Sequence, residues 1–310
     1  MNYEEFLLDL LGKDESYVIL TAENRAAMRN LPGKIKDRFI DVGIAEQTMV
    51  GIAAGLALRG RIPIVHALST FLTMRAFEFI RTDVGIGKLP VKLMGSFSGF
   101  LSEANGPTHQ AVEDISLMRG IPNVNVFSPS DEEDMIIGLP KVFASPNPYY
   151  IRYTNLKPVV EHNKNFEIGK AEIISEGTDV VILVHGMLLK EAIEASRILS
   201  DSGRSAGVVN VRSLKPADEN TLINICKNSN LVVTIEDHFL TGGLYSILSE
   251  IIVKNRIICR VLPVALDNTW FKPALLNDVL YYEKFDGRSI TEKINIELKK
   301  IQRPEPQYSI

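Results

Sequence analysis

Short runs rich in valine and isoleucine alternate with helical patterns along nearly the whole chain of 310 residues. This alternation limits the possible folds more than any other feature, because strands separated by helices form parallel sheets covered on both faces. Near-continuous apolar runs are typical of strands in such sheets. We therefore predict an α/β protein with two doubly wound, mostly parallel-sheet domains.

The first series of strands and helices ends near residue 153, and a second series begins near residue 180. The segment 155–169 between them is irregular and polar, which is typical of a linker. We predict a first domain of residues 1–160 and a second of residues 168–310, since a chain of this length can form two cores. The predicted strands are 17–20, 38–41, 62–66, 91–95, 124–127, 149–153, 180–184, 206–211, 231–235 and 257–262, and the predicted helices are 45–59, 71–82, 112–118, 132–142, 188–200, 220–227, 244–253 and 290–301.

Composition argues against several classes of protein. The net charge of -4 offers no electrostatic basis for binding nucleic acid or an anionic membrane surface. No run of about 18 apolar residues could span a bilayer, and the start of the chain does not have the layout of a signal peptide, so we expect a cytoplasmic protein. Cys226 and Cys259 fit no metal-ligand spacing, and we expect small core residues rather than disulfide partners.

A carboxylate, Glu46, stands where a predicted strand gives way to the very apolar helix 49–58. A helix that is apolar all round is buried, so we expect Glu46 at a buried helix end. Burial disfavours the charged form of a carboxyl group, which can then share a proton with a ring nitrogen. The alternative is a structural glutamate favoured by the positive end of the helix. The residues alone leave both interpretations open.

The stretch RFIDVGIAEQTMVGIAAGLA, residues 38–57, resembles the pyrimidine-domain signature of transketolases and deoxyxylulose-phosphate synthases. In that family the matching glutamate bonds the aminopyrimidine ring of thiamine diphosphate and drives the tautomer that deprotonates the thiazolium carbon. The resemblance implies that Glu46 is the cofactor-activating acid. It extends over nearly the whole chain, pyrimidine domain first and transketolase C-terminal domain second. It therefore implies the C-terminal subunit of a split transketolase.

Two further segments agree with this resemblance. STFLTMRAF, residues 69–77, resembles the family stretch that surrounds the pyrimidine, which implies that Phe71 stacks on the ring and that Arg75 lines the pocket. For Phe77 we favour a place in the core. NGPTHQ, residues 105–110, resembles the loop whose histidine contacts substrate, which implies acid–base work for His109.

The chain also departs from the family pattern. Asn105 stands where the family loop carries an aspartate that reads substrate hydroxyls, and Glu23 stands where transketolases usually have aspartate in the cofactor pocket. A phosphate-binding arginine of relatives aligns with Asn155, while Arg152 lies three residues earlier. An amide can donate hydrogen bonds but adds no charge. The departures leave the cofactor chemistry intact and argue against the usual pentose-phosphate substrates.

The chain has no Gly-Asp-Gly followed by paired asparagines, the family motif for the magnesium diphosphate. The resemblance therefore implies that a separate N-terminal-type subunit binds the diphosphate and Mg²⁺ or a similar ion, and that two copies of each chain share the thiamine diphosphate in a heterotetramer. We expect self-association through the first domain, because helix 49–58 is too apolar to face water. The segment 236–243 could attract an anion at a helix start, although a packed turn is the favoured interpretation.

The function predicted from this resemblance is transfer of a two-carbon ketol unit from a ketose to an aldehyde acceptor. One alternative is an acyloin-forming activity like that of deoxyxylulose-phosphate synthase, although the wording of the loop 106–110 favours transketolase. Another is a non-catalytic assembly subunit, which would have no need of Glu46, Phe71 and His109 together. The donor and acceptor sugars are not identified by the fold.

Overall fold

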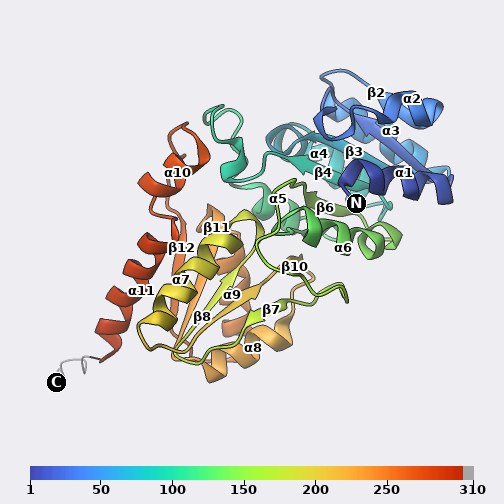
Figure 1. Ribbon diagram of the computed structural model, residues 1–310. Coiled ribbons are helices and arrows are strands. Elements are labelled where there is room, and N and C mark those ends of the chain that lie inside the picture. The colour runs from blue at the N-terminus through green and yellow to red at the C-terminus, as the bar shows by residue number, and fades with distance from the viewer. Residues whose placement is uncertain (303–310) are drawn as a thin grey trace.

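The computed structural model describes residues 1–302 and contains two α/β domains, each built on a mostly parallel sheet (Figure 1). The predicted fold class is therefore confirmed, while residues 303–310 of the predicted second domain lie outside the described range. The first part of the chain forms α1 (Tyr3–Lys13), β1 (Tyr17–Thr21), η1 (Ala26–Met28), α2 (Leu31–Ile35), η2 (Lys36–Arg38), β2 (Phe39–Asp41), α3 (Glu46–Leu58), β3 (Ile62–Leu68), η3 (Phe71–Arg75), α4 (Phe77–Phe79), η4 (Ile80–Gly85), β4 (Lys92–Ser96), η5 (Phe100–Ser102), α5 (Asp114–Gly120), β5 (Asn125–Phe127), α6 (Glu132–Ala144) and β6 (Tyr149–Arg152).

The second part begins after residues 153–171, which contain no helix or strand and include the predicted linker. The exact boundary between the domains stays a prediction. The elements that follow are β7 (Glu172–Ser175), β8 (Val180–Val184), η6 (Gly186–Leu188), α7 (Leu189–Asp201), β9 (Ala206–Asn210), β10 (Ser213–Lys215), α8 (Glu219–Asn228), β11 (Leu231–Phe239), α9 (Leu244–Asn255), β12 (Val261–Leu266), α10 (Leu276–Tyr282) and α11 (Gly287–Gln302).

The first sheet has the strand order β10-β5-β6-β4-β3-β1-β2 and is parallel except for β10. Successive residues of a strand point to opposite faces, and β1 follows this rule. Val18 and Leu20 pack in the core that includes α3, whereas Tyr17 and Ile19 pack in the core that includes α1 and α6. The sheet is thus covered on both sides, as expected for near-continuous apolar strands.

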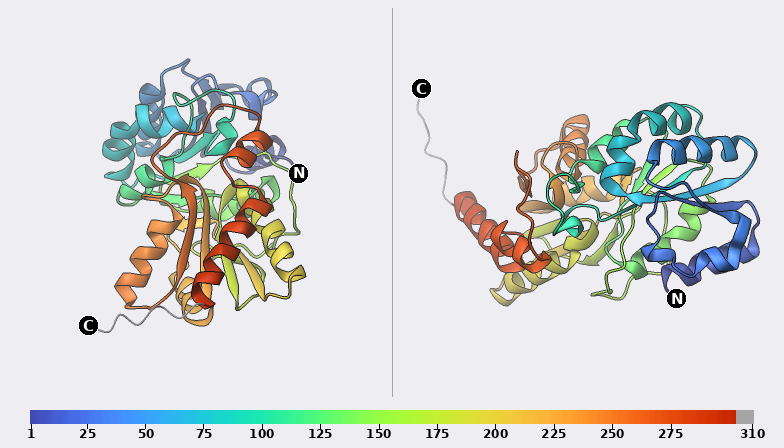
Figure 2. Two further views of the ribbon diagram at one scale, coloured as in Figure 1. Left: turned by 90° about the vertical axis from the view of Figure 1, so that its left-hand side faces the viewer. Right: turned by 90° about the horizontal axis from the view of Figure 1, so that it is seen from above.

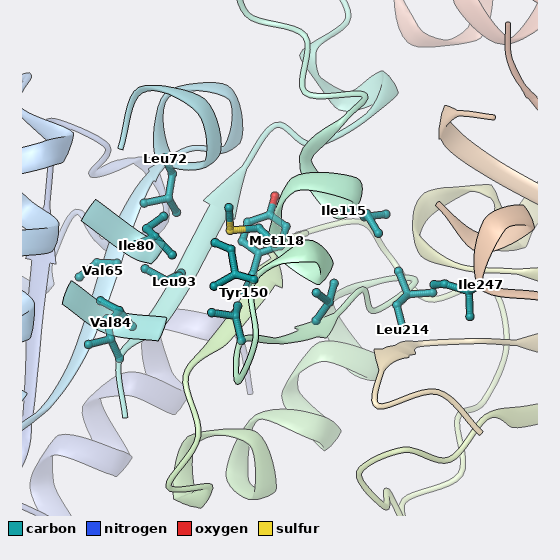
Figure 3. Packing of buried hydrophobic residues seen from close by; sticks show 14 of the residues in the cluster. Val65, Leu72, Ile80, Val84, Leu93, Ile115, Met118, Tyr150, Leu214 and Ile247 are labelled. Carbon is teal, nitrogen blue, oxygen red and sulfur yellow. The ribbon is translucent and has the colours of Figure 1, made fainter. Parts of the chain in front are cut away.

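The second sheet has the order β12-β11-β8-β9-β7, with only β7 antiparallel. Helices α7 and α11 lie together on one face, and α8 and α9 on the other (Figure 2). The two domains share part of their core, because Leu214 and Ile247 of the second half belong to the same cluster as Ile115 (Figure 3). β10 strengthens this connection, since it is encoded in the second half and pairs with β5.

The strands and helices predicted from the sequence are present, with two instructive differences. The predicted strand 257–262 begins only at Val261, because Arg256 adopts the left-handed conformation (φ 55°) and Ile257 N donates back to Ile252 O at the end of α9. The predicted helix 71–82 is a succession of π-helical and α-helical turns, η3, α4 and η4. No helix within residues 1–302 is both long and apolar enough to cross a membrane.

Candidate active site

The carboxyl ends of four adjacent parallel strands, β6, β4, β3 and β1, meet at one edge of the first sheet. Ligands of open α/β sheets bind at this edge, where the chain leaves each strand. Glu23 follows β1, Phe71 follows β3 and Asn155 follows β6. The strand order therefore gathers side chains that are far apart in the sequence.

Glu46 is the first residue of α3, and its side chain is 2% exposed. The turn that leads to it depends on Gly43, whose φ of 71° favours glycine and whose N–H donates to Asp41 Oδ1 at 2.9 Å. Arg75 Nη1 donates to Glu46 Oε2 at 2.8 Å and supplies the counter-charge that a buried carboxylate needs. The carboxyl group thus has one oxygen bound to Arg75.

Phe71 links Arg75 to the histidine of the predicted substrate loop. The Arg75 guanidinium lies 4.1 Å from the centroid of the Phe71 ring, and the His109 ring meets Phe71 edge-to-face with centroids 5.1 Å apart. Thr70 Oγ1 donates to the carbonyl oxygen of His109 at 2.9 Å, which holds the loop against η3. Glu46, Arg75, Phe71 and His109 therefore form one continuous group.

A pocket of about 210 Å³ opens beside this group. Glu46, Phe71 and Glu23 line it together with the apolar side chains of Leu68 and Ile44. A planar heteroaromatic ring fits these walls, because Phe71 offers a stacking surface and the buried carboxyl group of Glu46 can bond a ring nitrogen. Since Arg75 already covers one face of Phe71, such a ring would stack on the other face. The residues present fit an aminopyrimidine.

A second pocket, of about 320 Å³, shares the side chain of Asn24 with the first. Asn155, Tyr153 and Phe97 line it, and Leu276 of α10 closes it from the second domain. Of its lining residues within the described chain, none is a lysine, arginine or histidine, while Glu103 is acidic. The walls of this pocket are thus apolar, amide and acidic in character.

Two family models match the chain: "Transketolase, pyrimidine binding domain" at residues 4–157 and "Transketolase, C-terminal domain" at residues 169–290. The chain belongs to the transketolase family. The family predicted from the sequence is therefore confirmed.

Among the similar proteins is a "6-deoxy-6-sulfo-D-fructose transketolase subunit" of Clostridium sp. (strain MSTE9), 37% identical over 82% of this chain and 80% of its own length. A "1-deoxy-D-xylulose-5-phosphate synthase" of Dictyoglomus thermophilum is 38% identical over 84% of this chain but only 43% of its own length. A solved structure titled "Split gene transketolase, inactive beta4 tetramer" superposes with a TM-score of 0.87 at 31% identity, covering 96% of this chain and 97% of that one.

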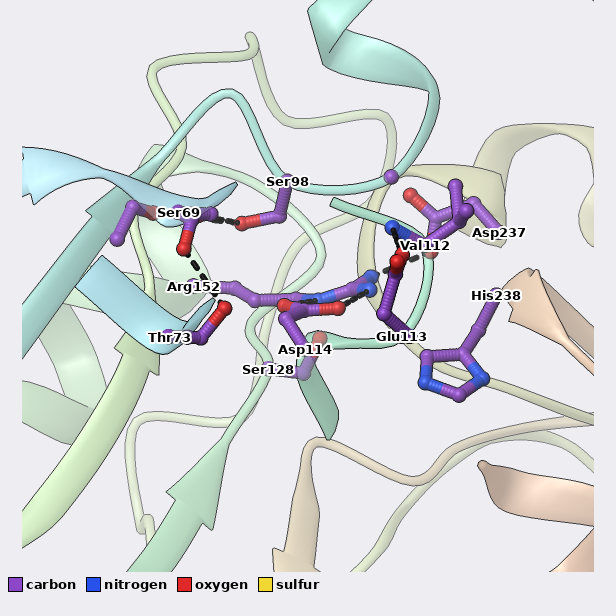
Figure 4. Close-up of polar contacts among 12 residues, drawn as sticks. Ser69, Thr73, Ser98, Val112, Glu113, Asp114, Ser128, Arg152, Asp237 and His238 are labelled. Carbon is purple, nitrogen blue, oxygen red and sulfur yellow. Dashed lines mark hydrogen bonds and ion pairs between the residues drawn. The ribbon is translucent and has the colours of Figure 1, made fainter. Parts of the chain in front are cut away.

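In this transketolase-family chain Arg152 lies away from both pockets, in the interface between the domains (Figure 4). Its guanidinium donates to Asp114 through Nη2 (2.6 Å) and Nε (2.8 Å) and to Asp237 through Nη1 (2.5 Å). Burial raises the pKa of Asp114, but the charge and hydrogen bonds of Arg152 outweigh it and hold that pKa below its usual range. Arg152 is thus engaged within the protein, and the geometry does not bring it to a substrate.

The remaining predicted substrate residue, Asn105, is exposed at the start of the loop that carries His109. Gly106, with φ 79°, turns the chain between them, and Gln110 Nε2 donates to the carbonyl oxygen of Phe271 in the second domain at 2.8 Å. The loop therefore spans the two domains above η3. Asn105 itself lines neither pocket.

Asn24, Phe97 and Tyr153 also line the second pocket, although no motif in the sequence pointed to them. Asn24 Nδ2 donates to Ser96 Oγ at 2.9 Å, which places its amide between the two pockets. Phe97 has a backbone φ of 58°, which residues other than glycine rarely adopt. Such backbone conformations cluster at functional sites. All three lie at or shortly after the carboxyl ends of predicted strands. Because ligands of open α/β sheets bind at these strand ends, the three residues could have been identified from the sequence.

In this transketolase-family chain the side-chain carboxyl group of Glu236 occupies the position at the start of α9 that could have held an anion. Glu236 accepts hydrogen bonds from Leu244 N at 2.6 Å and Tyr245 N at 2.9 Å. A Cβ at Gly243 would lie 1.8 Å from Glu236 Oε2, so this turn requires glycine. Burial raises the pKa of Glu236 to about 8. The geometry favours the packed turn over an external anion site.

A buried group of metal-ligand type, Asp134, His162 and Glu172, lies near the linker. Arg212 Nη1 lies 2.5 Å from Asp134 Oδ1 and 3.5 Å from Glu172 Oε2, so a guanidinium occupies the place of a cation. Burial would lower the pKa of His162, but hydrogen bonds to Asp131 and Glu172 raise it to about 10. The cluster is a closed ion network that fastens the linker to both domains.

Proposed function

We propose that this chain is the pyrimidine-binding subunit of a split transketolase-type enzyme that moves a two-carbon ketol unit from a ketose to an aldehyde. The observation that carries the proposal is the buried Glu46 carboxyl group in the wall of a pocket that Phe71 also lines. The solved split-gene transketolase supports it, since the two chains match over nearly their full lengths.

Thiamine diphosphate, when bound, supplies the nucleophilic carbon for this chemistry. Glu46 would exchange a proton with the ring nitrogen of the pyrimidine, and Phe71 would hold the ring by stacking. Arg75 fixes the orientation of Glu46 through its ion pair, and Glu23 closes the pocket at its outer side. His109, half-buried beside Phe71, would move a proton at a substrate oxygen.

The proposal includes a partner chain that binds the diphosphate and its divalent ion, because this sequence lacks the Gly-Asp-Gly motif with paired asparagines and its pocket beside Glu46 offers only the pyrimidine side. Large apolar side chains stay exposed on and near α3: Ile44 is 71% exposed and Leu58 is 74% exposed. The helix therefore buries only one face within a single chain. Large apolar side chains left exposed at both ends of one helix support an interface along it. We propose that they pack against a second copy and the partner in a heterotetramer.

For the substrate we propose a sugar whose far end is not a simple phosphate. Asn155 lines the second pocket, and its other described lining residues offer amide, hydroxyl, carboxylate and apolar groups but no positive charge. Hydrogen bonds from neutral donors are roughly half as strong as charge-assisted ones. The relative named as a 6-deoxy-6-sulfo-D-fructose transketolase subunit is consistent with a distal group other than phosphate.

A second candidate is an acyloin-forming activity of the synthase type, favoured by the 38% identity with deoxyxylulose-phosphate synthase. One reconstitution distinguishes the candidates. The chain would be mixed with the N-terminal-type subunit, thiamine diphosphate and Mg²⁺, and assayed with ketose plus aldehyde and, separately, with pyruvate plus aldehyde.

We expect turnover with the ketose donor in the mixture and no turnover with this chain alone. Turnover with pyruvate plus aldehyde but not with ketose plus aldehyde would assign the synthase-type reaction. Tight, Mg²⁺-dependent binding of thiamine diphosphate by the isolated chain, measured by calorimetry, would contradict the split-enzyme proposal, and a monodisperse monomer would contradict self-association through α3.

A further inference from the structure

Cys226 and Cys259 are brought together at the end of the second domain that faces away from the first. Cys226 is in the last turn of α8, and Cys259 lies just before β12. Both are free thiols; Cys226 is 2% exposed, whereas Cys259 is half-buried. They line one pocket of about 480 Å³. The sequence separation of the two cysteines concealed this contact.

The two thiols differ in their chemistry. The neighbouring Cys259 thiol, together with burial, raises the pKa of Cys226, whereas the neighbouring Cys226 thiol lowers the pKa of Cys259. The thiolate is the nucleophile in thiol–disulfide exchange, so the accessible Cys259 is the one prepared to attack. Cys226 is held beside it in its protonated form. This is the arrangement of an attacking and a resolving cysteine.

The pocket has a positive rim. Arg204, Lys227 and Arg260 line it, and Asp179, the one carboxylate among its lining residues within 1–302, is occupied by hydrogen bonds from Ser205 N at 2.8 Å and Asn230 Nδ2 at 3.2 Å. The rim would concentrate an anionic reagent near Cys259. These three basic residues lie at the end of α8 and in the turns before β9 and β12, at the amino ends of the strands. The carboxyl ends face the first domain, so the candidate active site lies at the other end.

We propose that Cys226 and Cys259 form a reversible disulfide by exchange with an anionic low-molecular-weight disulfide that enters this pocket. The Cys259 thiolate attacks one sulfur of the reagent, forms a mixed disulfide and releases the other half as a thiolate. Cys226 then loses its proton and attacks the Cys259 sulfur, which releases the second half as a thiolate that takes up that proton. The two protein thiols are oxidised and the reagent is reduced to two thiol-containing halves.

The test uses the full chain and glutathione disulfide as the probe, with intact mass and peptide mapping as the readout. The wild type should lose two hydrogen atoms in mass and carry a mapped Cys226–Cys259 disulfide, which a thiol reductant reverses. Cys226→Ser should stop at the mixed disulfide on Cys259. Cys259→Ser should keep Cys226 free, because that thiol is buried. The thermal midpoint of the oxidised wild type should rise, since the cross-link restricts the unfolded chain.

The charged rim is tested separately with Arg260→Gln. This variant should react severalfold more slowly with glutathione disulfide and at an unchanged rate with the uncharged bis(2-hydroxyethyl) disulfide. Equal rates with the charged probe in both proteins would overturn the role of the rim. Wild type that keeps both thiols free, forms a linked dimer or accumulates a stable mixed disulfide would overturn the proposal, and peptide mapping of the wild type alone decides this if a serine variant does not fold.

Discussion

Two groups in this chain both pair an arginine with carboxylates, but one group borders a pocket and the other lies buried between the domains. In the candidate active site Glu46 is 2% exposed but its partner Arg75 is 39% exposed, and one ion pair joins them. In the domain interface Arg152, Asp114 and Asp237 are all at most 5% exposed, and each of the three side-chain nitrogens of Arg152 donates to a carboxylate. The first group borders a pocket, and the second is closed.

The difference shows which carboxyl groups can still bind a ligand. Arg75 holds one oxygen of Glu46 and leaves the other oxygen to a ring nitrogen. Asp114 and Asp237 are bound by Arg152 inside the interface, and removal of one partner would leave an uncompensated buried charge. Arg152, although predicted to contact substrate, therefore belongs to the structure of the protein rather than to its pocket.

The largest expected effect is on catalysis by Glu46→Gln in the reconstituted assembly. The amide cannot exchange a proton with the pyrimidine, so turnover should fall roughly 10²–10⁴-fold while folding is preserved. Hydrogen exchange at the reactive carbon of the cofactor measures the step directly. The matched control is Glu78→Gln, which makes the same change at an exposed carboxylate in α4, three residues after Arg75. Unchanged exchange in Glu46→Gln would reject the assignment.

Arg152→Leu should affect stability instead. It leaves Asp114 and Asp237 buried without their counter-charge, so the free energy of unfolding should fall by about 3–5 kcal/mol. Arg25→Leu removes an exposed arginine from its pair with Asp41 and should cost about 0–1 kcal/mol. Denaturant unfolding of both variants measures the contrast. Similar losses of unfolding free energy in the two variants would show that the buried pairs of Arg152 stabilise the protein no more than an exposed ion pair does.

The free energy of unfolding should also fall in acid, because His238 is buried in the domain interface. Its Nε2 accepts from Ser116 N at 3.3 Å and its Nδ1 donates to Phe239 O at 2.6 Å, which defines a neutral ring. Burial lowers the pKa of His238 from 6.5 to about 4. Between these values the unfolded chain binds more protons, so stability is full above pH 6.5 and is lost as pH falls toward 4.

The expected slope from this histidine is about 1.4 kcal/mol per pH unit within that window. Unfolding free energies of wild type and His238→Gln, measured from pH 7 to pH 4, give the contribution as the difference between the two slopes. His66, whose pKa burial lowers to about 3, remains in both proteins and cancels. Parallel pH curves would show that His238 is not held neutral by the interface.

The smallest expected effect concerns substrate specificity at the second pocket, which Asn155 lines. Asn155→Arg adds a charge-assisted donor to the second pocket, so the ratio of kcat/KM for phosphorylated over dephosphorylated sugar should rise about tenfold. Asn165→Arg makes the same charge change on the exposed linker and should leave the ratio unchanged. If the wild type already favours the phosphorylated sugar as strongly as Asn155→Arg, the neutral pocket has no bearing on substrate choice.

Local sequence was sufficient for much of the site. Glu46 could be located because a strand, a glycine turn and an apolar helix follow one another, and these features are local. Phe71 and Arg75 are likewise four residues apart on one helical segment, which brings their side chains together. Interactions of this range depend on backbone periodicity alone and can be deduced from residue order.

The roles of Arg152, β10 and the two cysteines depend on contacts between distant segments, which residue order does not specify. Arg152 meets Asp237 only because the carboxyl ends of β6 and β11 face each other across the domain interface. By itself the sequence determined the fold class, the family and the carboxylate at the helix start, because apolar periodicity and local turns act over a few residues. Only the tertiary structure decided which charges face a pocket and which neutralise one another, because desolvation and pairing depend on what the rest of the chain packs around them.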